Sequence, residues 1–214
     1  MFELMQAIPF SFAALFPVLN PLGSAIIFLT FTQCLPEPAV HKLAVKIAIN
    51  TFILLVVVLL TGSWILQFFG ITIPIVQIGG GLVVAYIGWS LLNQSSNGSG
   101  TNQAAAKDVQ EALGLAFFPL TMPITAGPGC IAVTLTIGAH ELTRHVATTI
   151  MGELGAIIGI ILSAITVFFC YRYADKLTNK LGASGKQVIM RLSAFINLCI
   201  GLEIIWHGVQ GLIF

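Results

Sequence analysis

The stretch FPVLNPLGSAI at residues 16–26 decides how this chain folds, because it interrupts a hydrophobic run long enough to cross a bilayer. A second stretch, FPLTMPITAGPGCIA at residues 118–132, repeats its pattern. Each opens with Phe-Pro, places a second proline four residues after the first, and reaches a glycine before apolar sequence resumes. Because proline removes a backbone donor and clashes with the preceding turn, each stretch should break its helix. The sequence therefore predicts two broken helices.

The composition is that of a polytopic membrane protein. Of the 214 residues, 57% are apolar and only 8% are charged, whereas a soluble domain averages about 25% charged residues. The mean hydropathy is +0.98. A spanning helix needs about 20 mostly apolar residues, and the sequence has room for spans at residues 4–31, 43–69, 74–92, 112–139, 146–171 and 188–214.

The same composition argues against several classes of protein. Nine Lys and Arg against eight Asp and Glu give no basic excess, so we expect no nucleic-acid partner. The four cysteines are scattered without a Cys-x-x-Cys pair, which favours apolar packing over a metal or redox role. No metal-ligand spacing, nucleophile elbow or phosphate-binding loop occurs. We therefore expect neither an enzyme nor a bound cofactor.

The placement of Lys and Arg predicts the orientation. The loops between spans 1–2, 3–4 and 5–6, with the adjoining helix ends, carry Lys42, Lys46, Lys107, Arg172, Lys176, Lys180, Lys186 and Arg191. The opposite side carries only Arg144, and the most basic loop is expected at residues 172–186. These three loops are thus predicted to lie in the cytoplasm, with both termini outside.

The repeated stretches divide the chain into two halves of three spans each. We expect a first three-helix repeat at residues 1–92, a cytoplasmic linker at 93–111 and a second repeat at 112–214, all within one membrane domain. Because three is odd, the two halves must enter the membrane from opposite sides. The predicted fold is an all-α membrane protein of six helices in two inverted repeats, with helices 1 and 4 broken at mid-membrane.

The two breaks are the predicted binding site. A broken helix frees N–H groups at the start of its second half and C=O groups at the end of its first, which suits the two charges of a zwitterion. No aromatic cage or basic cluster lies at the breaks, which favours a small, neutral substrate. The alternative is that the breaks are packing kinks without a ligand. The candidate substrate-binding residues are Asn20, Pro21, Gly23, Ser24, Thr121, Pro123, Thr125, Ala126, Gly127, Pro128 and Gly129.

Ionisable residues within the spans are candidates for coupling transport to a proton or to sodium. Glu203 and His207 lie one turn apart on one face of the last span, and Glu153 lies about two turns into the fifth. The alternative is an interfacial charge, which we favour for Glu153 and hold equally for Glu203. Intramembrane amides such as Asn197 more commonly bond between helices.

Taken together, several motifs resemble the MarC family of membrane proteins. They are Asn20-Pro21-Leu22-Gly23, the run FGITIPIVQIGGGLVVAYIGW from Phe69 to Trp89, PLTMPITAGPG from Pro119 to Gly129, and the closing run from Arg191 to Gly211. The resemblance covers nearly the whole chain. It implies an integral inner-membrane protein of six spans, in the cytoplasmic membrane of a bacterium or archaeon.

The SnatA branch of that family implies a substrate class, namely small neutral amino acids such as glycine and alanine. Two positions depart from the family pattern. Gln77 stands where arginine is frequent, which weakens a role for an obligatory cation there, and Glu203 stands where glutamine is frequent, which adds an acid. Neither departure touches the two broken-helix motifs.

These observations lead to the hypothesis of a secondary transporter that moves a small neutral amino acid, or a similar zwitterion, by alternating access. One rival is a protein of the same family that exports other small metabolites or drugs. Another is a channel or a non-transporting scaffold. The sequence leaves open the exact substrate, the direction of transport, the coupling ion and whether the chain forms a homo-oligomer in the bilayer.

Overall fold

The computed structural model describes residues 2–93, 108–142 and 146–213, and its regular elements are all helical. In chain order they are α1 (Phe2–Leu19), α2 (Pro21–Thr32), α3 (Glu37–Phe69), α4 (Ile73–Asn93), α5 (Val109–Gly114), η1 (Ala116–Thr125), α6 (Pro128–Leu142), α7 (Val146–Arg172) and α8 (Ala174–Ile213).

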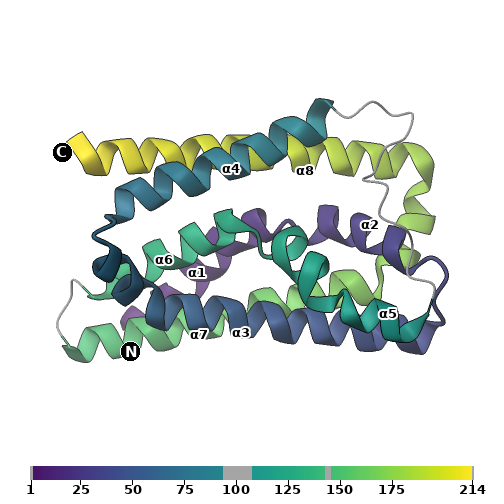
Figure 1. Ribbon diagram of the computed structural model, residues 1–214, viewed down its shortest axis with the longest axis horizontal. Coiled ribbons are helices and arrows are strands. Elements are labelled where there is room, and N and C mark those ends of the chain that lie inside the picture. The colour runs from purple at the N-terminus through teal and green to yellow at the C-terminus, as the bar shows by residue number, and fades with distance from the viewer. Residues whose placement is uncertain (1, 94–107, 143–145, 214) are drawn as a thin grey trace.

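The long helices run side by side along one axis (Figure 1). The antiparallel pair α4 and α8 forms one side of the molecule, α3 and α7 form the opposite side, and α1, α2 and α6 lie between them. Both ends of the chain lie at the same end of the molecule. The connections from α2 to α3 and from α7 to α8 lie at the other end, which is the arrangement that an even number of spans requires.

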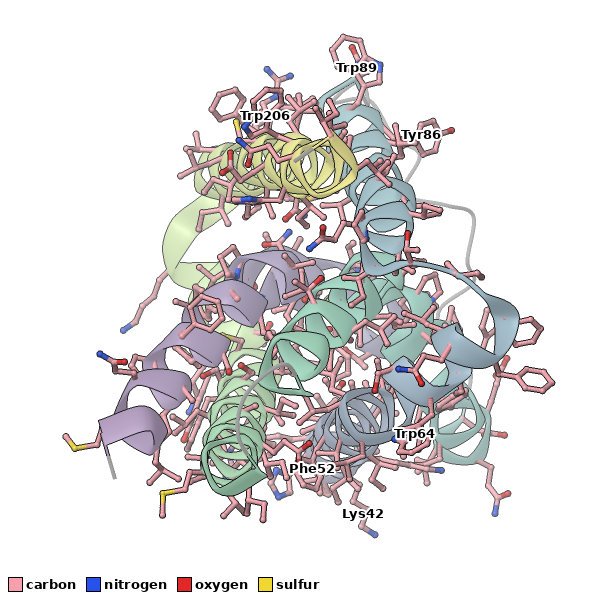
Figure 2. The ribbon with its side chains drawn as sticks, turned by 90° about the vertical axis from the view of Figure 1, so that its left-hand side faces the viewer. Lys42, Phe52, Trp64, Tyr86, Trp89 and Trp206 are labelled. Carbon is pink, nitrogen blue, oxygen red and sulfur yellow. The ribbon has the colours of Figure 1, made fainter. Side chains whose placement is uncertain are left out.

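The helices have the length and composition of membrane spans. Among the described residues, four helices, at Glu37–Phe69, Ile73–Asn93, Ile150–Arg172 and Gln187–Ile213, are long and apolar enough to cross a bilayer. Two bent pairs also qualify when each is taken as one span, which gives up to six. The outer surface is rich in large apolar side chains, and Figure 2 shows Tyr86, Trp89 and Trp206 on the outer side of α4 and α8. In lipid such a surface needs no cover.

Each bent pair falls where the sequence places a break. Leu4–Leu19 and Pro21–Thr32 meet at an angle of 43°, and Ala116–Thr125 and Pro128–Gly138 meet at 70°. Pro9 and Pro17 lie inside α1 and do not end it, although Pro17 belongs to the first predicted stretch.

Glycines let α4 and α8 touch backbone to backbone. A Cβ atom on Gly81 would lie 2.7 Å from the carbonyl oxygen of Gly201, and one on Gly208 would lie 2.7 Å from that of Pro74. A Cβ atom on Gly88 would likewise lie 2.7 Å from the carbonyl oxygen of Ala194. Such contacts are too short for any larger side chain, so α4 and α8 form a tightly packed pair.

One predicted segment lies where it was expected, between the candidate spans Ile150–Arg172 and Gln187–Ile213, but its local structure was predicted wrongly. Residues 172–186, expected to be a basic loop, lie almost wholly in helix, because α7 extends to Arg172 and α8 begins at Ala174. The helix is interrupted at Tyr173, which forms the turn between α7 and α8, and at Gly182, which has the positive φ of 64° that glycine adopts readily. Hydropathy marks where a chain enters lipid, but a polar helix can continue beyond the membrane surface. Most of the predicted linker, residues 94–107, lies outside the described residues.

Candidate functional site

The first break is a point bend made by one residue. Asn20 has φ 45° and ψ 57°, the left-handed conformation, and it caps α2 by accepting a hydrogen bond from the Gly23 amide at 3.2 Å. Its carbonyl oxygen accepts from the amide and the hydroxyl of Ser24, at 2.9 and 2.8 Å. Pro21 follows as the first residue of α2, where its missing N–H costs nothing. The sequence Asn-Pro therefore ends one helix and starts the next without a loop.

The second break is an unwound segment rather than a point. Within η1, Phe118 and Met122 have extended backbone angles, and the prolines that follow them, Pro119 and Pro123, are preceded by cis peptide bonds. The segment is held by its own threonines. Thr121 Oγ1 donates to the Ala116 carbonyl at 2.7 Å, and Thr125 Oγ1 donates to the Leu120 carbonyl at 2.6 Å, each five residues back.

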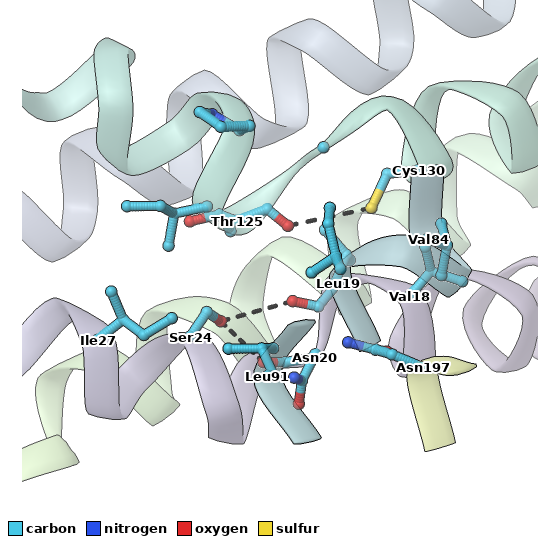
Figure 3. Close-up of a pocket in the computed structure, with 15 residues that line it drawn as sticks. Val18, Leu19, Asn20, Ser24, Ile27, Val84, Leu91, Thr125, Cys130 and Asn197 are labelled. Atoms are coloured by element: carbon cyan, nitrogen blue, oxygen red, sulfur yellow. Dashed lines mark hydrogen bonds between the residues drawn. The ribbon is translucent and has the colours of Figure 1, made fainter. Parts of the chain in front are cut away.

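The two breaks face a single cavity of about 250 Å³ (Figure 3). The first break and α2 contribute residues 18–20, 24 and 27, while the second break contributes residues 123–125, 127, 129 and 130. Residues 84, 87 and 91 of α4 and residue 197 of α8 close the other side. None of these fifteen lining residues is Asp, Glu, Lys, Arg or His, so the cavity suits a ligand without net charge.

One residue that lines the cavity carries a buried polar atom without a partner. Asn197 is only 6% exposed, and its Oδ1 atom is buried with no hydrogen-bond partner. In Figure 3 its amide is turned toward that of Asn20. An unpaired buried amide oxygen costs roughly 1–3 kcal/mol. A ligand that donates a hydrogen bond to Asn197 would recover that cost.

The two ends of the cavity have different linings. A Cβ atom on Gly129 would collide with Val84 and lie 3.2 Å from Val18, so these three lining residues pack closely together at one end, which we call the seal. At the opposite end the lining residues include Ile27, in the middle of α2, and Leu91, near the last residue of α4. The cavity thus extends toward the end of the molecule that is away from the termini.

Tyr171 of α7 contacts the second break at Thr125. Its hydroxyl lies 2.6 Å from Thr125 Oγ1, and its ring stacks on Phe28 of α2 with centroids 4.6 Å apart. All three residues are buried. Tyr171 therefore ties the unwound segment to the half-helix that follows the first break.

The predicted substrate-binding residues divide into two groups. Six of them line the cavity together: Asn20, Ser24, Pro123, Thr125, Gly127 and Gly129. The others, which are Pro21, Gly23, Thr121, Ala126 and Pro128, support the breaks but do not line the cavity.

Two of the glycines have structural reasons for lacking a side chain. The space over Gly23 is filled by the Asn20 side chain, and the space over Gly129 is filled by Val84. Gly127 is different, because a Cβ atom there would meet only the Pro123 carbonyl oxygen, at 3.0 Å. Of the glycines at the breaks, Gly127 is therefore the one that leaves room for a ligand.

The predicted coupling residues lie away from the cavity. Glu203 and His207 contact one another, with Oε1 and Nε2 3.2 Å apart, and their side chains are 67% and 61% exposed on α8. Glu153 is partly buried in α7. None of the three lines the cavity.

Two contributions to the site were not predicted from the sequence. The α4 residues Val84, Ile87 and Leu91 form a wall of the cavity, and Asn197 supplies its unpaired oxygen. The sequence offered a signal for Asn197, since an amide in an apolar span needs a hydrogen-bond partner. It did not indicate that this amide lines the cavity.

Comparison with known proteins places the chain in a family. The model of the "MarC family integral membrane protein" matches residues 5–213. The inner membrane protein MarC of Salmonella typhimurium is 30% identical over 219 residues, covering 100% of this chain and 98% of the relative. The membrane protein YvbG of Bacillus subtilis is 31% identical over 203 residues, covering 94% and 93%. No solved structure matches the chain.

Proposed function

This chain belongs to the MarC family of integral membrane proteins, and from that premise we propose that it is a six-span secondary transporter of a small neutral amino acid. The observation that carries the proposal is that two broken helices, about a hundred residues apart in the sequence, open onto one cavity without an ionisable carboxylate, ammonium, guanidinium or imidazole in its lining. Paired discontinuous helices of this kind are typical of substrate sites in secondary transporters.

The chemistry of the cavity matches a zwitterion. Helix α6 begins at Pro128, which has no N–H, so the amide of Gly129 is the first donor of that half-helix. The positive end of α6 would attract the substrate carboxylate. The substrate ammonium would donate to Asn197 Oδ1, the buried oxygen without a partner.

The size of the cavity favours a small substrate. Its volume of about 250 Å³ is several times the roughly 30 Å³ that one water occupies in the liquid and lies below the roughly 300–1,000 Å³ typical of pockets for drug-sized ligands. The apolar wall formed by Val84, Ile87 and Leu91 would accept a methyl group but no charge. Glycine and alanine fit these limits.

The helix contacts support an arrangement as inverted repeats. If α1–α2, α3 and α4 correspond to η1–α6, α7 and α8, the most extensive packed pairs have equivalents. Contacts of α1 with α7 correspond to those of η1 and α6 with α3, and contacts of α4 with α6 correspond to those of α8 with α2. The pairs α4–α8 and α3–α7 map onto themselves. Both breaks would then lie at the same depth, near mid-membrane.

The same contacts suggest how access alternates. The tightly packed α4–α8 pair would move as one unit, and the remaining helices would form the other. Rocking of one unit against the other would part the seal at Val18, Val84 and Gly129 and close the end at Ile27 and Leu91. By the distribution of Lys and Arg, the end at Ile27 and Leu91 would be cytoplasmic.

Ligand-induced stabilisation of the purified protein tests this proposal. A ligand that binds only the folded state adds about 2.7 kcal/mol at a hundredfold excess over its dissociation constant. We expect millimolar glycine, alanine or serine to raise the melting temperature, lysine and glutamate to leave it unchanged, and proteoliposomes to show saturable glycine or alanine flux. Drug-sized compounds alone producing the shift would favour export of other molecules. Binding without flux would indicate a scaffold, and flux that does not saturate would indicate a channel.

A further inference from the structure

A groove between α3 and α7 runs along the outer surface, away from the substrate cavity. Its volume is about 470 Å³, and every residue that lines it is apolar: Val45, Ala48, Ile49, Phe52, Ile161, Ala164, Ile165 and Phe168. Ala48 and Ala164 are 9% and 6% exposed and form its floor, whereas Ile49 and Ile165 stand at its rims, 51% and 45% exposed. The groove shares no residue with the cavity between the breaks.

A polar pocket of about 350 Å³ continues this groove toward the end of the molecule away from the termini. Phe168 joins the two, because it lines the groove and its ring lies edge-on to that of His41 in the pocket, with centroids 5.6 Å apart. Arg172, one turn beyond Phe168 on α7, lies over the same ring at 6.0 Å. The apolar groove and the polar pocket are therefore one continuous surface.

Cationic groups gather around the pocket. Arg172 and Lys176 line it, and their charged groups lie 5.8 and 5.7 Å from the ring centroid of Tyr173. Arg172 Nη1 is 2.7 Å from His41 Nδ1, which occupies one of its five N–H donors and leaves the rest of the guanidinium for a ligand. Lys42 points outward from α3 on the face where Phe52 lies (Figure 2).

The charge around the pocket favours an anion. The pocket is lined by two cations, Arg172 and Lys176, and by one acid, Glu37, while Asp175 lines an adjoining cavity. Two positive charges and one negative charge in the lining leave a positive balance. A guanidinium suits a phosphate because its forked donors match two phosphate oxygens.

We propose that this surface binds one anionic phospholipid, with its phosphate at Arg172 and Lys176 and an acyl chain in the groove over Ala48 and Ala164. A basic pocket at a helix end beside an apolar groove is the combination that anionic lipid headgroups and chains require together. Tyr173 lies where an aromatic ring marks the boundary between headgroups and chains. The site depends on the chain lying in a membrane but not on the substrate that it carries.

Native mass spectrometry of the full-length protein with added lipid tests the proposal. We expect dioleoyl phosphatidylglycerol to bind at least about tenfold more tightly than dioleoyl phosphatidylcholine, and the Arg172→Gln/Lys176→Gln variant to lose that preference. The matched control, Lys180→Gln/Arg191→Gln, removes two cations outside the pocket and should keep it. Arg172→Lys retains the positive charge but loses the paired N–H donors of the guanidinium. Its preference for phosphatidylglycerol over phosphatidylcholine should therefore lie between those of the unmodified protein and the double variant.

A second pair of variants tests the groove. Ala48→Leu/Ala164→Leu fills its floor and should weaken phosphatidylglycerol binding, whereas Ala13→Leu, at an exposed alanine of α1, should not. Equal binding of the two lipids by the unmodified protein, or equal losses in the control, would overturn the proposal. Competition by millimolar inorganic phosphate that matches the effect of the lipid would assign the pocket to a free anion instead. Helical circular dichroism and a monodisperse elution profile confirm that each variant is folded.

Discussion

The two breaks share a sequence pattern but differ in how they interrupt their helices. At the first, one residue in the left-handed conformation turns the chain by 43°, and its own side chain caps the next helix. At the second, η1 unwinds at two positions before a bend of 70°. The first break is thus self-contained, because Asn20 satisfies the backbone groups that it frees. The second leaves its backbone facing the cavity.

This difference assigns the two breaks different tasks. Asn20 accepts from the Gly23 amide with its side chain and from Ser24 with its carbonyl, so little of its hydrogen-bonding capacity remains for a ligand. The cavity lining from the second break is longer and includes Gly127 and Gly129 at the start of α6. We therefore expect substitutions at the second break to act on binding and those at the first to act on stability.

The largest effect should come from Gly127→Leu. Its side chain would enter the cavity, since only the Pro123 carbonyl oxygen lies near the position of its Cβ. We expect amino-acid binding to weaken by at least about a hundredfold, near 2.7 kcal/mol, while the protein still folds. A thermal-shift titration with glycine and alanine measures this. Gly79→Leu, at a glycine of α4 with nothing within 4 Å, is the control, and unchanged binding by the Gly127 variant would refute close backbone contact.

The next effect should come from Asn197→Leu, in which stability and binding change in opposite directions. Removing the unpaired Oδ1 relieves a cost of roughly 1–3 kcal/mol in the ligand-free protein. We expect the ligand-free melting temperature to stay level or rise and amino-acid binding to weaken about tenfold, the loss of one hydrogen bond to a charged group. Parallel unfolding and binding measurements separate the two. A variant that is less stable yet binds normally would show that Asn197 is structural.

A double-mutant cycle at the cavity seal should show an intermediate effect on stability. Gly129→Ala places a methyl group against Val84, and such overpacking costs typically about 1–3 kcal/mol. Val84→Ala removes the obstacle, so the double variant should be less destabilised than the two single changes predict. Unfolding in detergent micelles gives the coupling energy, which we expect at about 0.5–3 kcal/mol for residues in contact. If the two changes in unfolding free energy are strictly additive, the residues around Gly129 and Val84 can move apart without cost.

At the first break, two substitutions of Asn20 should lower the stability of the protein by different amounts. Asn20→Gly keeps the left-handed conformation and should cost only a few tenths of a kcal/mol, about what a glycine cap loses relative to asparagine. Asn20→Ala loses both the cap and the conformational tolerance and should cost about 1–3 kcal/mol. Both should bind amino acids nearly as well as the unmodified protein. Strong loss of binding in the folded Asn20→Gly variant would mean that the first break also holds the substrate.

The smallest effect should come from Glu203→Gln. The pair Glu203–His207 is exposed on α8 and does not line the cavity, so it does not contact a substrate bound there. We expect unchanged amino-acid binding and an unchanged pH profile of uptake. A shifted pH profile would instead support coupling through this acid and would place part of the mechanism outside the two breaks.

The sequence was most informative where local chemistry decides the backbone. Asn-Pro at residues 20–21 and the prolines and glycines of residues 118–129 predicted both interruptions, because these residues restrict the backbone of their own turn. A single proline did not suffice, since Pro9 and Pro17 lie inside α1. It was misleading at residues 172–186, where low hydropathy suggested a loop and the chain forms helix. The roles of Gly23 and Gly129 were also not predicted, since the side chain that fills the space over Gly23 belongs to Asn20, three residues earlier, and the one over Gly129 belongs to Val84 on another helix.

The sequence alone therefore determined the class of the protein, the position of its apolar spans and the two places where a helix must stop. These properties follow from composition and from backbone restrictions within a few residues. Only the tertiary structure decided that both breaks open onto one cavity, that α4 forms its wall and that Asn197 of α8 lacks a partner within it. The reason is physical: in lipid the burial of apolar side chains does not select helix neighbours, so the close fit of helix surfaces sets which residues meet.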